Sequence, residues 1–332
     1  MQKILVIQTA FIGDVVLATG LLEKLHAQWP EVSLDILVRR GNESLFHQHP
    51  FIHEVLVWDK KRKKYQQLLA ILKKIRSERY DKVINVQRFA ATGLLTAFSK
   101  AKQTIGFDKN PFSFLFSDVV RHLVNEGDHT LHEIERNHQL ILSFTDAKAA
   151  KPKLYPTDSD ASFVRQWKQK PYICIAPASV WFTKQFPADQ WAHFIDVLPK
   201  EITVYLIGGA GDHSLCENIR SHSPHISVIN LTGQLNFLQS AALMKDALMN
   251  YVNDSAPMHF ASAVNAPVTA VYCSTIPAFG FGPLSDSSHV IEVTEPLSCR
   301  PCGLHGRKKC PLIHFNCAKL ITSSQLVAVL PR

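Results

Sequence analysis

Long apolar runs are absent from this chain of 332 residues, since no stretch approaches the roughly 20 apolar residues that a membrane-spanning helix requires. The low numbers of glycine and proline, 14 and 18, exclude collagen-like and low-complexity chains. Seven cysteines, a small and odd number, argue against a disulfide scaffold. A hydrophobic content of 46% and a net charge of only +8 exclude disorder. The length suits two domains of roughly 150 residues each.

Secretion and nucleotide signatures are also missing. Residues 1–7 carry one charge and then a strand-like run, which predicts a cytoplasmic protein without a signal peptide. No G-x-x-x-x-G-K-[ST] motif occurs, which disfavours a P-loop enzyme, and no G-x-G-x-x-G follows the first expected strand. The Gly-rich residues 208–211 follow an expected strand in the second half, where they are either a weak phosphate loop or a plain turn.

The positive charge is concentrated in one segment. Residues 59–82 hold most of the excess, centred on the run of five cations at 60–64. This segment is either a solvated helix face or a surface for an anionic partner such as a phosphorylated substrate or a membrane leaflet. Few aromatic residues are interleaved with the cations, so base stacking is poorly supported and no nucleic-acid partner is expected.

Apolar patterning predicts an α/β protein in which strands and helices alternate. In the first half we expect strands at 3–8, 33–38, 54–58, 82–86 and 103–107, and helices at 14–28, 65–76 and 130–144. The polar, Pro-bearing residues 145–171 read as a linker. In the second half we expect strands at 172–176, 203–207, 249–252 and 268–272, and helices near 188–198, 237–245 and 257–264, with a last helix from 323.

Three loops that follow expected strands carry chemistry. Asp14 opens the first helix, after a Gly13 that suits a tight turn, and is either an N-cap or a general base. Ser179, Thr183 and Lys184 precede a helix near Pro187 and suit a phosphate, although an ordinary loop explains them equally well. In the third loop Asp254 or Ser255 caps a helix whose amides face an anion, and His259 either donates to that anion or packs in the core.

Four segments together resemble the ADP-heptose–lipopolysaccharide heptosyltransferases of glycosyltransferase family 9, with the type II enzymes as the nearest match. These segments are 13–22 (GDVVLATGLL), 176–187 (APASVWFTKQFP), 231–241 (LTGQLNFLQSA) and 253–267 (NDSAPMHFASAVNAP). The resemblance spans nearly the whole chain and implies a GT-B fold, with two Rossmann-like domains whose parallel sheets face a central cleft. The implied domains are 1–150 for the acceptor and 170–322 for the ADP-sugar, with a terminal helix 323–332 packing back toward the N-terminal domain.

The resemblance also implies an inverting reaction without metal or cofactor, in which heptose moves from ADP-L-glycero-D-manno-heptose to the inner core of lipopolysaccharide. Asp14 matches the catalytic base, and Lys184 matches the contact to the donor diphosphate, where its charge would stabilise departing ADP. Further donor-site matches are Ser179, Thr183, Asp212, Leu235, Asp254, Ser255 and His259. Ala256 stands where the family usually has glycine, and residues 273–275 replace a Gly-containing turn, which puts the exact donor in doubt.

An anionic acceptor, a Kdo- or heptosyl-Kdo-lipid A at the inner-membrane surface, would give the basic segment a role. We hypothesise acceptor contacts for Lys61, Arg62, Lys64, Arg88 and Arg136 and a location peripheral to the inner membrane. The open alternatives are a type I heptosyltransferase, a GT-B transferase with another nucleotide sugar, and a nonenzymatic anion-binding protein.

The C-terminal cysteines form the most ligand-like isolated pattern. Cys299, Cys302, Cys310 and Cys317 are spaced C-x2-C-x7-C-x6-C, with His305 and His314 between them. Reduced structural thiols, a zinc site and a disulfide are all compatible with this spacing, and no catalytic metal is expected.

Overall fold

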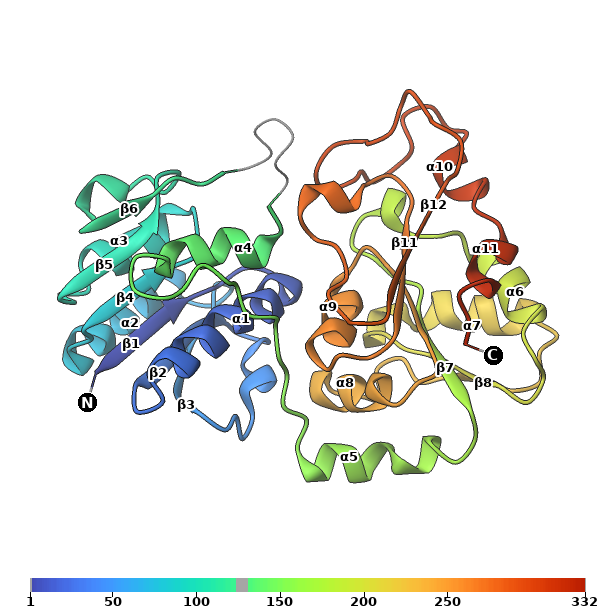
Figure 1. The fold of residues 1–332 in the computed structure, drawn as a ribbon, viewed down its shortest axis with the longest axis horizontal. Coiled ribbons are helices and arrows are strands. Elements are labelled where there is room, and N and C mark those ends of the chain that lie inside the picture. Colours follow the sequence, from blue (N-terminus) through green and yellow to red (C-terminus); the bar gives the residue numbers. More distant parts are fainter. Residues whose placement is uncertain (1, 124–130, 332) are drawn as a thin grey trace. The chain divides into compact units, whose positions relative to one another are not determined.

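The chain forms two compact α/β units in a computed structural model, which describes residues 2–123 and 131–331. The first unit spans Met1–Tyr155 and the second Pro156–Arg332, and in Figure 1 helices flank the sheet of each unit. Three residues at the ends of expected segments, Met1, Thr130 and Arg332, lie outside the described residues.

The first unit contains a six-stranded, all-parallel sheet in the order β3-β2-β1-β4-β5-β6. Its inner strands are continuous apolar runs because helices cover both faces of a parallel sheet. The strands are β1 (Lys3–Ile7), β2 (Ser33–Arg39), β3 (Ile52–Trp58), β4 (Lys82–Asn85), β5 (Gln103–Phe107) and β6 (Asp118–Val120).

The described α-helices of this unit are α1 (Ile12–Gln28), α2 (Lys64–Glu78), α3 (Ala90–Ala97) and α4 (Glu133–His138). Helices α1, α2 and α3 contact the sheet, and α4 packs on α1. Helix α2 shows why the basic segment is helical. Leu68, Leu72 and Ile75 recur at helical spacing and are buried against the sheet, whereas its cations lie on the other faces.

The second unit repeats this architecture with the order β12-β11-β10-β7-β8-β9, again all parallel. Its strands are β7 (Tyr172–Ala176), β8 (Thr203–Leu206), β9 (Val228–Asn230), β10 (Asn250–Asn253), β11 (Val268–Tyr272) and β12 (Ser288–Glu292). Its helices are α5 (Asp158–Val164), α6 (Ala188–Asp196), α7 (His213–His222), α8 (Phe237–Lys245), α9 (Ala256–Ala263), α10 (Asn316–Lys319) and α11 (Ser323–Val327).

The terminal helix α11 packs within the second unit. Leu326 of α11 is fully buried in the core of the second unit. The Tyr251 hydroxyl donates to the Leu326 carbonyl oxygen at 3.0 Å, and the Gln325 amide donates to the Glu292 carbonyl oxygen at 3.0 Å. Burial of Leu326 and these hydrogen bonds fix α11 beside β10 and β12.

Two expectations need correction. The predicted linker contains helix α5, which is closed by a capping box between Thr157 and Asp160 and packs on α8. The predicted long helix at 130–144 is shorter: α4 ends at His138 and a 3-10 turn, Gln139–Ile141, follows.

Candidate functional site

Each sheet has one point where the strand order reverses, between β1 and β4 in the first unit and between β7 and β10 in the second. In open parallel sheets, ligands bind beyond the carboxyl ends of the strands at such points. Asp14 lies in the first turn of the helix that follows β1, and Arg88 lies in the segment after β4, whereas the segments after β7 and β10 carry Lys184 and Asp254. The topology therefore brings the main predicted residues of each unit to its own switch point.

An ion pair forms the centre of the second unit's switch point. The Lys184 ammonium lies 2.6 Å from Asp254 Oδ2, and the side chains are only 16% and 9% exposed. The Thr275 hydroxyl donates to the same Asp254 oxygen at 2.7 Å. Lys184 is thus held by a carboxylate whose charge an anionic ligand would have to replace.

Thr183 connects this ion pair to two distant segments. Its hydroxyl accepts from the Ser274 hydroxyl at 2.9 Å and from the Arg307 backbone amide at 2.7 Å. Its own amide donates to the Arg307 carbonyl oxygen at 3.1 Å. Because Thr183 is fully buried, it acts as an internal brace beside Lys184 and has no surface to offer a ligand here.

Polar side chains also brace the loops on either side. Asn253 accepts from the Phe186 amide at 3.0 Å and donates to the Pro177 carbonyl oxygen at 2.6 Å. The Ser179 carbonyl oxygen accepts from the Gln185 side-chain amide at 2.6 Å. These bonds fix the path of the loop after β7.

The third expected loop begins helix α9. Ser255 is its N-cap residue, but its hydroxyl donates to the Asn253 carbonyl oxygen at 3.3 Å and makes no side-chain cap. Pro257 follows in the first turn. His259 is buried on the same helix.

The Gly-rich residues 208–211 form a turn in which one backbone amide donates to the carboxylate of Asp212. The Asp212 carboxylate accepts from the Gly209 amide at 2.8 Å, and the Gly233 amide donates to the Gly208 carbonyl oxygen at 3.0 Å. A negative side chain thus occupies the backbone donor that a phosphate loop would offer, which favours the plain-turn interpretation.

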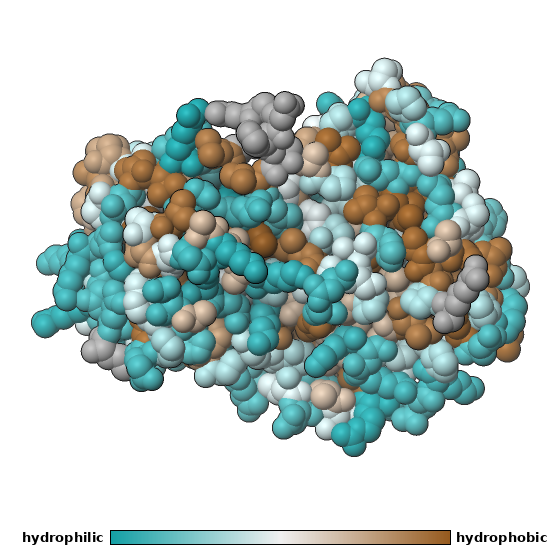
Figure 2. Space-filling view, in the orientation of Figure 1, coloured by the Kyte–Doolittle hydropathy of each residue, from teal (hydrophilic) through white to brown (hydrophobic). Residues whose placement is uncertain are grey.

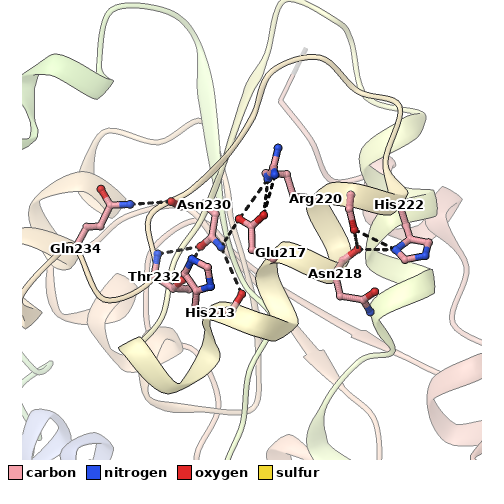
Figure 3. A network of polar contacts seen from close by, with 9 residues as sticks. His213, Glu217, Asn218, Arg220, His222, Asn230, Thr232 and Gln234 are labelled. Carbon is pink, nitrogen blue, oxygen red and sulfur yellow. Dashed lines mark hydrogen bonds and ion pairs between the residues drawn. The ribbon is translucent and has the colours of Figure 1, made fainter.

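Leu235 follows a loop that is tied to α7 through Asn230 (Figure 3). Asn230 Oδ1 accepts from the Thr232 amide at 3.0 Å and hydroxyl at 2.6 Å, while Asn230 Nδ2 donates to Glu217 at 2.8 Å. The Gln234 side-chain amide donates to the Asn230 carbonyl oxygen at 2.9 Å. The residues before half-buried Leu235 are therefore held in one conformation.

Asp14 lies in the first turn of α1, and the N-cap position belongs to Phe11. The N-cap interpretation of Asp14 is therefore wrong, and so is the tight turn at Gly13, which is helical. Asp14 is half-buried and interacts electrostatically with Arg39, from the end of β2, and with Glu133 of α4. A carboxylate there also benefits from the helix dipole.

Mostly buried polar side chains are hydrogen-bonded to one another at the carboxyl ends of β1, β3 and β4. The Gln87 side-chain amide donates to Gln8 Oε1 at 2.5 Å. The Lys60 ammonium donates to the Thr9 carbonyl oxygen at 2.7 Å and to its hydroxyl at 3.1 Å. These two bonds hold the Lys60 side chain on the loop after β1, and partial burial lowers the pKa of Lys60.

The other cations of the run at 60–64 are exposed. The Asp59 carboxylate accepts from the backbone amides of Lys61 and Arg62 at 2.9 and 3.2 Å, and both side chains are exposed. Lys64 begins α2, with its ammonium 5.6 Å from the Tyr65 ring centroid. Lys61, Arg62 and Lys64 are thus available to an anionic partner.

Arg88 and Arg136 differ in exposure. Arg88 is exposed, whereas Arg136 is buried and its guanidinium bonds Glu133 Oε2 at 2.8 and 2.9 Å and the Leu131 carbonyl oxygen at 2.6 Å. An acceptor contact by Arg136 would require this ion pair to open. Burial raises the pKa of Glu133 despite Arg136, and burial together with the charges of Arg88 and Arg136 lowers the pKa of His122 to about 4.

Burial, together with the charges of Cys302, Cys310 and Cys299, raises the pKa of Cys317 to about 11. The four C-terminal cysteines therefore lie near one another. All seven cysteines of the chain are free thiols. Over residues 2–123 and 131–331, no group of three or more His, Cys, Asp or Glu side chains is arranged to hold a metal ion. The structure therefore gives the zinc interpretation no support and contains no disulfide.

Several site residues were not identified from the sequence. Ser274, Thr275 and Arg307 reach Thr183 or Asp254 from positions 21 to 124 residues away. Glu133 has a local signal, an acid three residues before Arg136 on a helix. Ser274 and Thr275 lie in the turn after β11, whose departure from the Gly-containing turn of the family was the only sequence signal for them. Arg307 had no such signal.

Comparison with known proteins identifies the class. The model of glycosyltransferase family 9 (heptosyltransferase) matches residues 68–309, so this chain belongs to that family and is a glycosyltransferase. The lipooligosaccharide heptosyltransferase 2 of Haemophilus ducreyi is 25% identical over 324 residues, covering 89% of each chain. The lipopolysaccharide heptosyltransferase 3 of Escherichia coli K12 is 25% identical over 288 residues, covering 79% of this chain and 80% of that protein.

Among solved structures, the E. coli ADP-heptose lps heptosyltransferase II shares the fold with a TM-score of 0.81 at 21% identity, over 99% of this chain and 97% of that one. The GT-B fold expected from the sequence is thereby confirmed. Within the part of the chain that the structure describes, no helix combines the length and apolar content needed to cross a bilayer.

Proposed function

We propose that this protein is an inverting, metal-independent heptosyltransferase that moves heptose from ADP-L-glycero-D-manno-heptose to the inner core of lipopolysaccharide, as a type II-like enzyme. The observation that carries the proposal is the Lys184–Asp254 pair at the β7/β10 switch point of a family 9 chain. Relatives named lipooligosaccharide heptosyltransferase 2 and lipopolysaccharide heptosyltransferase 3 support the donor and acceptor classes.

In the proposed reaction, the Asp14 carboxylate takes the proton of an acceptor hydroxyl as that oxygen attacks the anomeric carbon of the donor. The bond from this carbon to the diphosphate breaks with its electron pair on ADP. Inversion follows because the attacking oxygen enters opposite the leaving group. Arg39 interacts electrostatically with Asp14, and a carboxylate must be ionised to take a proton.

The leaving ADP gains negative charge at its diphosphate, which a cation must stabilise. Lys184 supplies that charge when it exchanges Asp254 for the diphosphate, and the α9 amides after Ser255 supply further donors. Asp212, on the segment after β8, and Leu235, on the segment after β9, are proposed for the ribose and adenine ends, and Ser179 and His259 for other donor contacts. Thr183 acts by bracing Lys184, because its hydroxyl is already bonded within the protein.

On the acceptor side, the exposed cations Lys61, Arg62, Lys64 and Arg88 are proposed to bind the anionic Kdo or heptose region. An acceptor anchored by lipid A places the enzyme in the cytoplasm at the inner-membrane surface.

The test measures ADP release from ADP-heptose with Kdo-lipid A, with heptosyl-Kdo-lipid A, and with neither. We expect release that requires the heptosylated acceptor, survives EDTA and is lost in Asp14→Asn. Asp189→Asn is the matched control, because Asp189 is an exposed acid in the first turn of α6, and it should retain activity. Release with the Kdo-only acceptor would instead indicate type I, and no release with either would contradict the proposal.

A further inference from the structure

A turn near the C-terminus is pressed against the loop that carries Lys184. The Thr183 backbone and hydroxyl bond both backbone polar groups of Arg307, as described above. Gly306 has a φ of +75°, and a Cβ built on it would lie 2.9 Å from Lys184 Cγ. Only glycine allows this approach without strain, so the turn is fixed beside the stem of Lys184.

This turn encloses one side of a pocket of about 370 Å³. The lining comes from the loop after β7 and from the turn itself, as Trp181, Gly306, Arg307, Lys308, Lys309 and Pro311. The orange and red loops at the upper right of Figure 1 belong to this part of the second unit, and in Figure 2 hydrophobic and hydrophilic residues lie side by side there. The pocket thus combines an aromatic ring with cationic side chains.

The cations of this pocket differ from Lys184 in their pairing. Arg307, Lys308 and Lys309 are exposed, and none of them forms an ion pair with another described residue. Lys184, by contrast, is neutralised by Asp254. Three adjacent positive charges around a concave surface attract an anion, and no carboxylate of the described chain competes for them.

We propose that this pocket is a subsite for an acidic sugar of the acceptor. The flat indole of Trp181 suits the apolar face of a pyranose ring, and Arg307 with the two lysines suits the carboxylate or phosphate on that ring. A pocket of this volume is of the size that holds a small ligand. The inference rests on the proposed function for the identity of the acceptor, and it places an acceptor contact in the second unit, beside the donor site.

The binding test uses glucose 6-phosphate as the probe and glucose, inorganic phosphate and ADP for comparison, each titrated calorimetrically into the full chain. The pocket variant is Arg307→Gln, Lys308→Gln, Lys309→Gln. The control variant, Lys170→Gln, Lys200→Gln, Lys245→Gln, removes equal charge from exposed residues at the amino ends of strands. Trp181→Leu tests the ring separately.

We expect the wild type and the control variant to bind glucose 6-phosphate about tenfold more tightly than glucose or phosphate, and the pocket variant and Trp181→Leu to lose this preference. ADP affinity should be unchanged in every variant. In the transfer assay, the pocket variant should raise the KM for the acceptor about tenfold and leave the KM for the donor alone.

Equal binding of glucose 6-phosphate by the pocket variant and the wild type, or no binding by the wild type, would overturn the inference. A tenfold loss of ADP affinity in the pocket variant would assign the cations to the donor diphosphate instead. Loss of binding to vesicles of anionic phospholipid, with glucose 6-phosphate binding intact, would assign them to the membrane. Because probe binding needs no turnover, absence of transfer by the wild type would reject the proposed function without deciding the pocket.

Discussion

Replacing Asp254 by asparagine should destabilise the second unit, because it leaves the Lys184 charge without its partner. Removing one partner of a fully buried ion pair costs about 3–5 kcal/mol. Lys184 and Asp254 are 2.6 Å apart with side-chain exposures of 16% and 9%, so some hydration of the orphaned ammonium remains. We therefore expect Asp254→Asn to lower the free energy of unfolding by about 2–3 kcal/mol. For a unit of this size, this corresponds to a Tm lower by about 5–10 °C.

A double-mutant cycle separates the ion pair from other effects of the substitution. Lys184→Met in the Asp254→Asn background removes the orphaned charge, so the double variant should regain most of the lost stability. The matched control is Asp246→Asn, because Lys168 and Asp246 are also 2.6 Å apart but Asp246 is 56% exposed. Exposed pairs contribute about 0–1 kcal/mol, so this control should lose little.

The assay is calorimetric unfolding combined with urea titration, which reports whether the two units unfold separately. Additive losses in the cycle, or equal losses for Asp254→Asn and Asp246→Asn, would refute the reasoning. The first result would show that Lys184 and Asp254 are not coupled, and the second that burial does not determine the cost.

Three more predictions follow from packing and titration. Leu326→Ala should lower the free energy of unfolding by about 2–5 kcal/mol in urea, because Leu326 is fully buried; a loss below 1 kcal/mol would contradict the docking of α11. Thr183→Val should keep the volume but orphan the Arg307 amide and the Ser274 hydroxyl, and hydrogen exchange of residues 302–309 should rise, while unchanged protection would exclude the brace. Burial lowers the pKa of His49 to about 4 from 6.5, so the folded state binds fewer protons than the unfolded state between these values and stability should rise with pH across them. His49→Phe should flatten that rise, and an identical pH profile would show that another group causes it.

The parts of the fold that could be predicted from sequence are those with a strong apolar period. The inner strands β1, β7 and β11 are buried runs of four or five residues, and α2 has its apolar residues at helical spacing. The missed strands are at sheet edges: β6 has no buried residue, and β9 and β12 have one each. An edge strand buries little of its surface, so its sequence carries little signal.

Helix α7 was missed for a related reason. It is polar, and only Cys216 and Ile219 are buried among its ten residues. Two apolar positions do not establish a period, and the helix is held by α6 and by β9 instead. Helix α5 was not predicted, because its segment contains Pro156 and Pro171 and therefore resembles a linker.

For the candidate site, motif position was predictable and side-chain pairing was not. Asp14, Lys184 and Asp254 all follow strands, and the topology places each at a switch point. The partners of Thr183 and Asp254 come from far along the chain, and burial of Arg136 against Glu133 depends on tertiary packing. Pairings of this kind leave no local pattern in a single sequence.

The two switch points differ in how their charges are compensated, and the difference matches what the proposed reaction needs. Burial raises the pKa of Glu133, and the buried Arg136 guanidinium, 2.8 Å away, compensates the charge of Glu133 beside the Asp14 carboxylate. Lys184 is held by Asp254 until an anion replaces that carboxylate. A base has to stay charged and accessible before the reaction, whereas the cation for the leaving group is needed only once a diphosphate is present. In the proposed reaction, the Lys184–Asp254 pair keeps a partly buried cation in place before the donor binds, and the donor diphosphate then takes that cation by displacing Asp254.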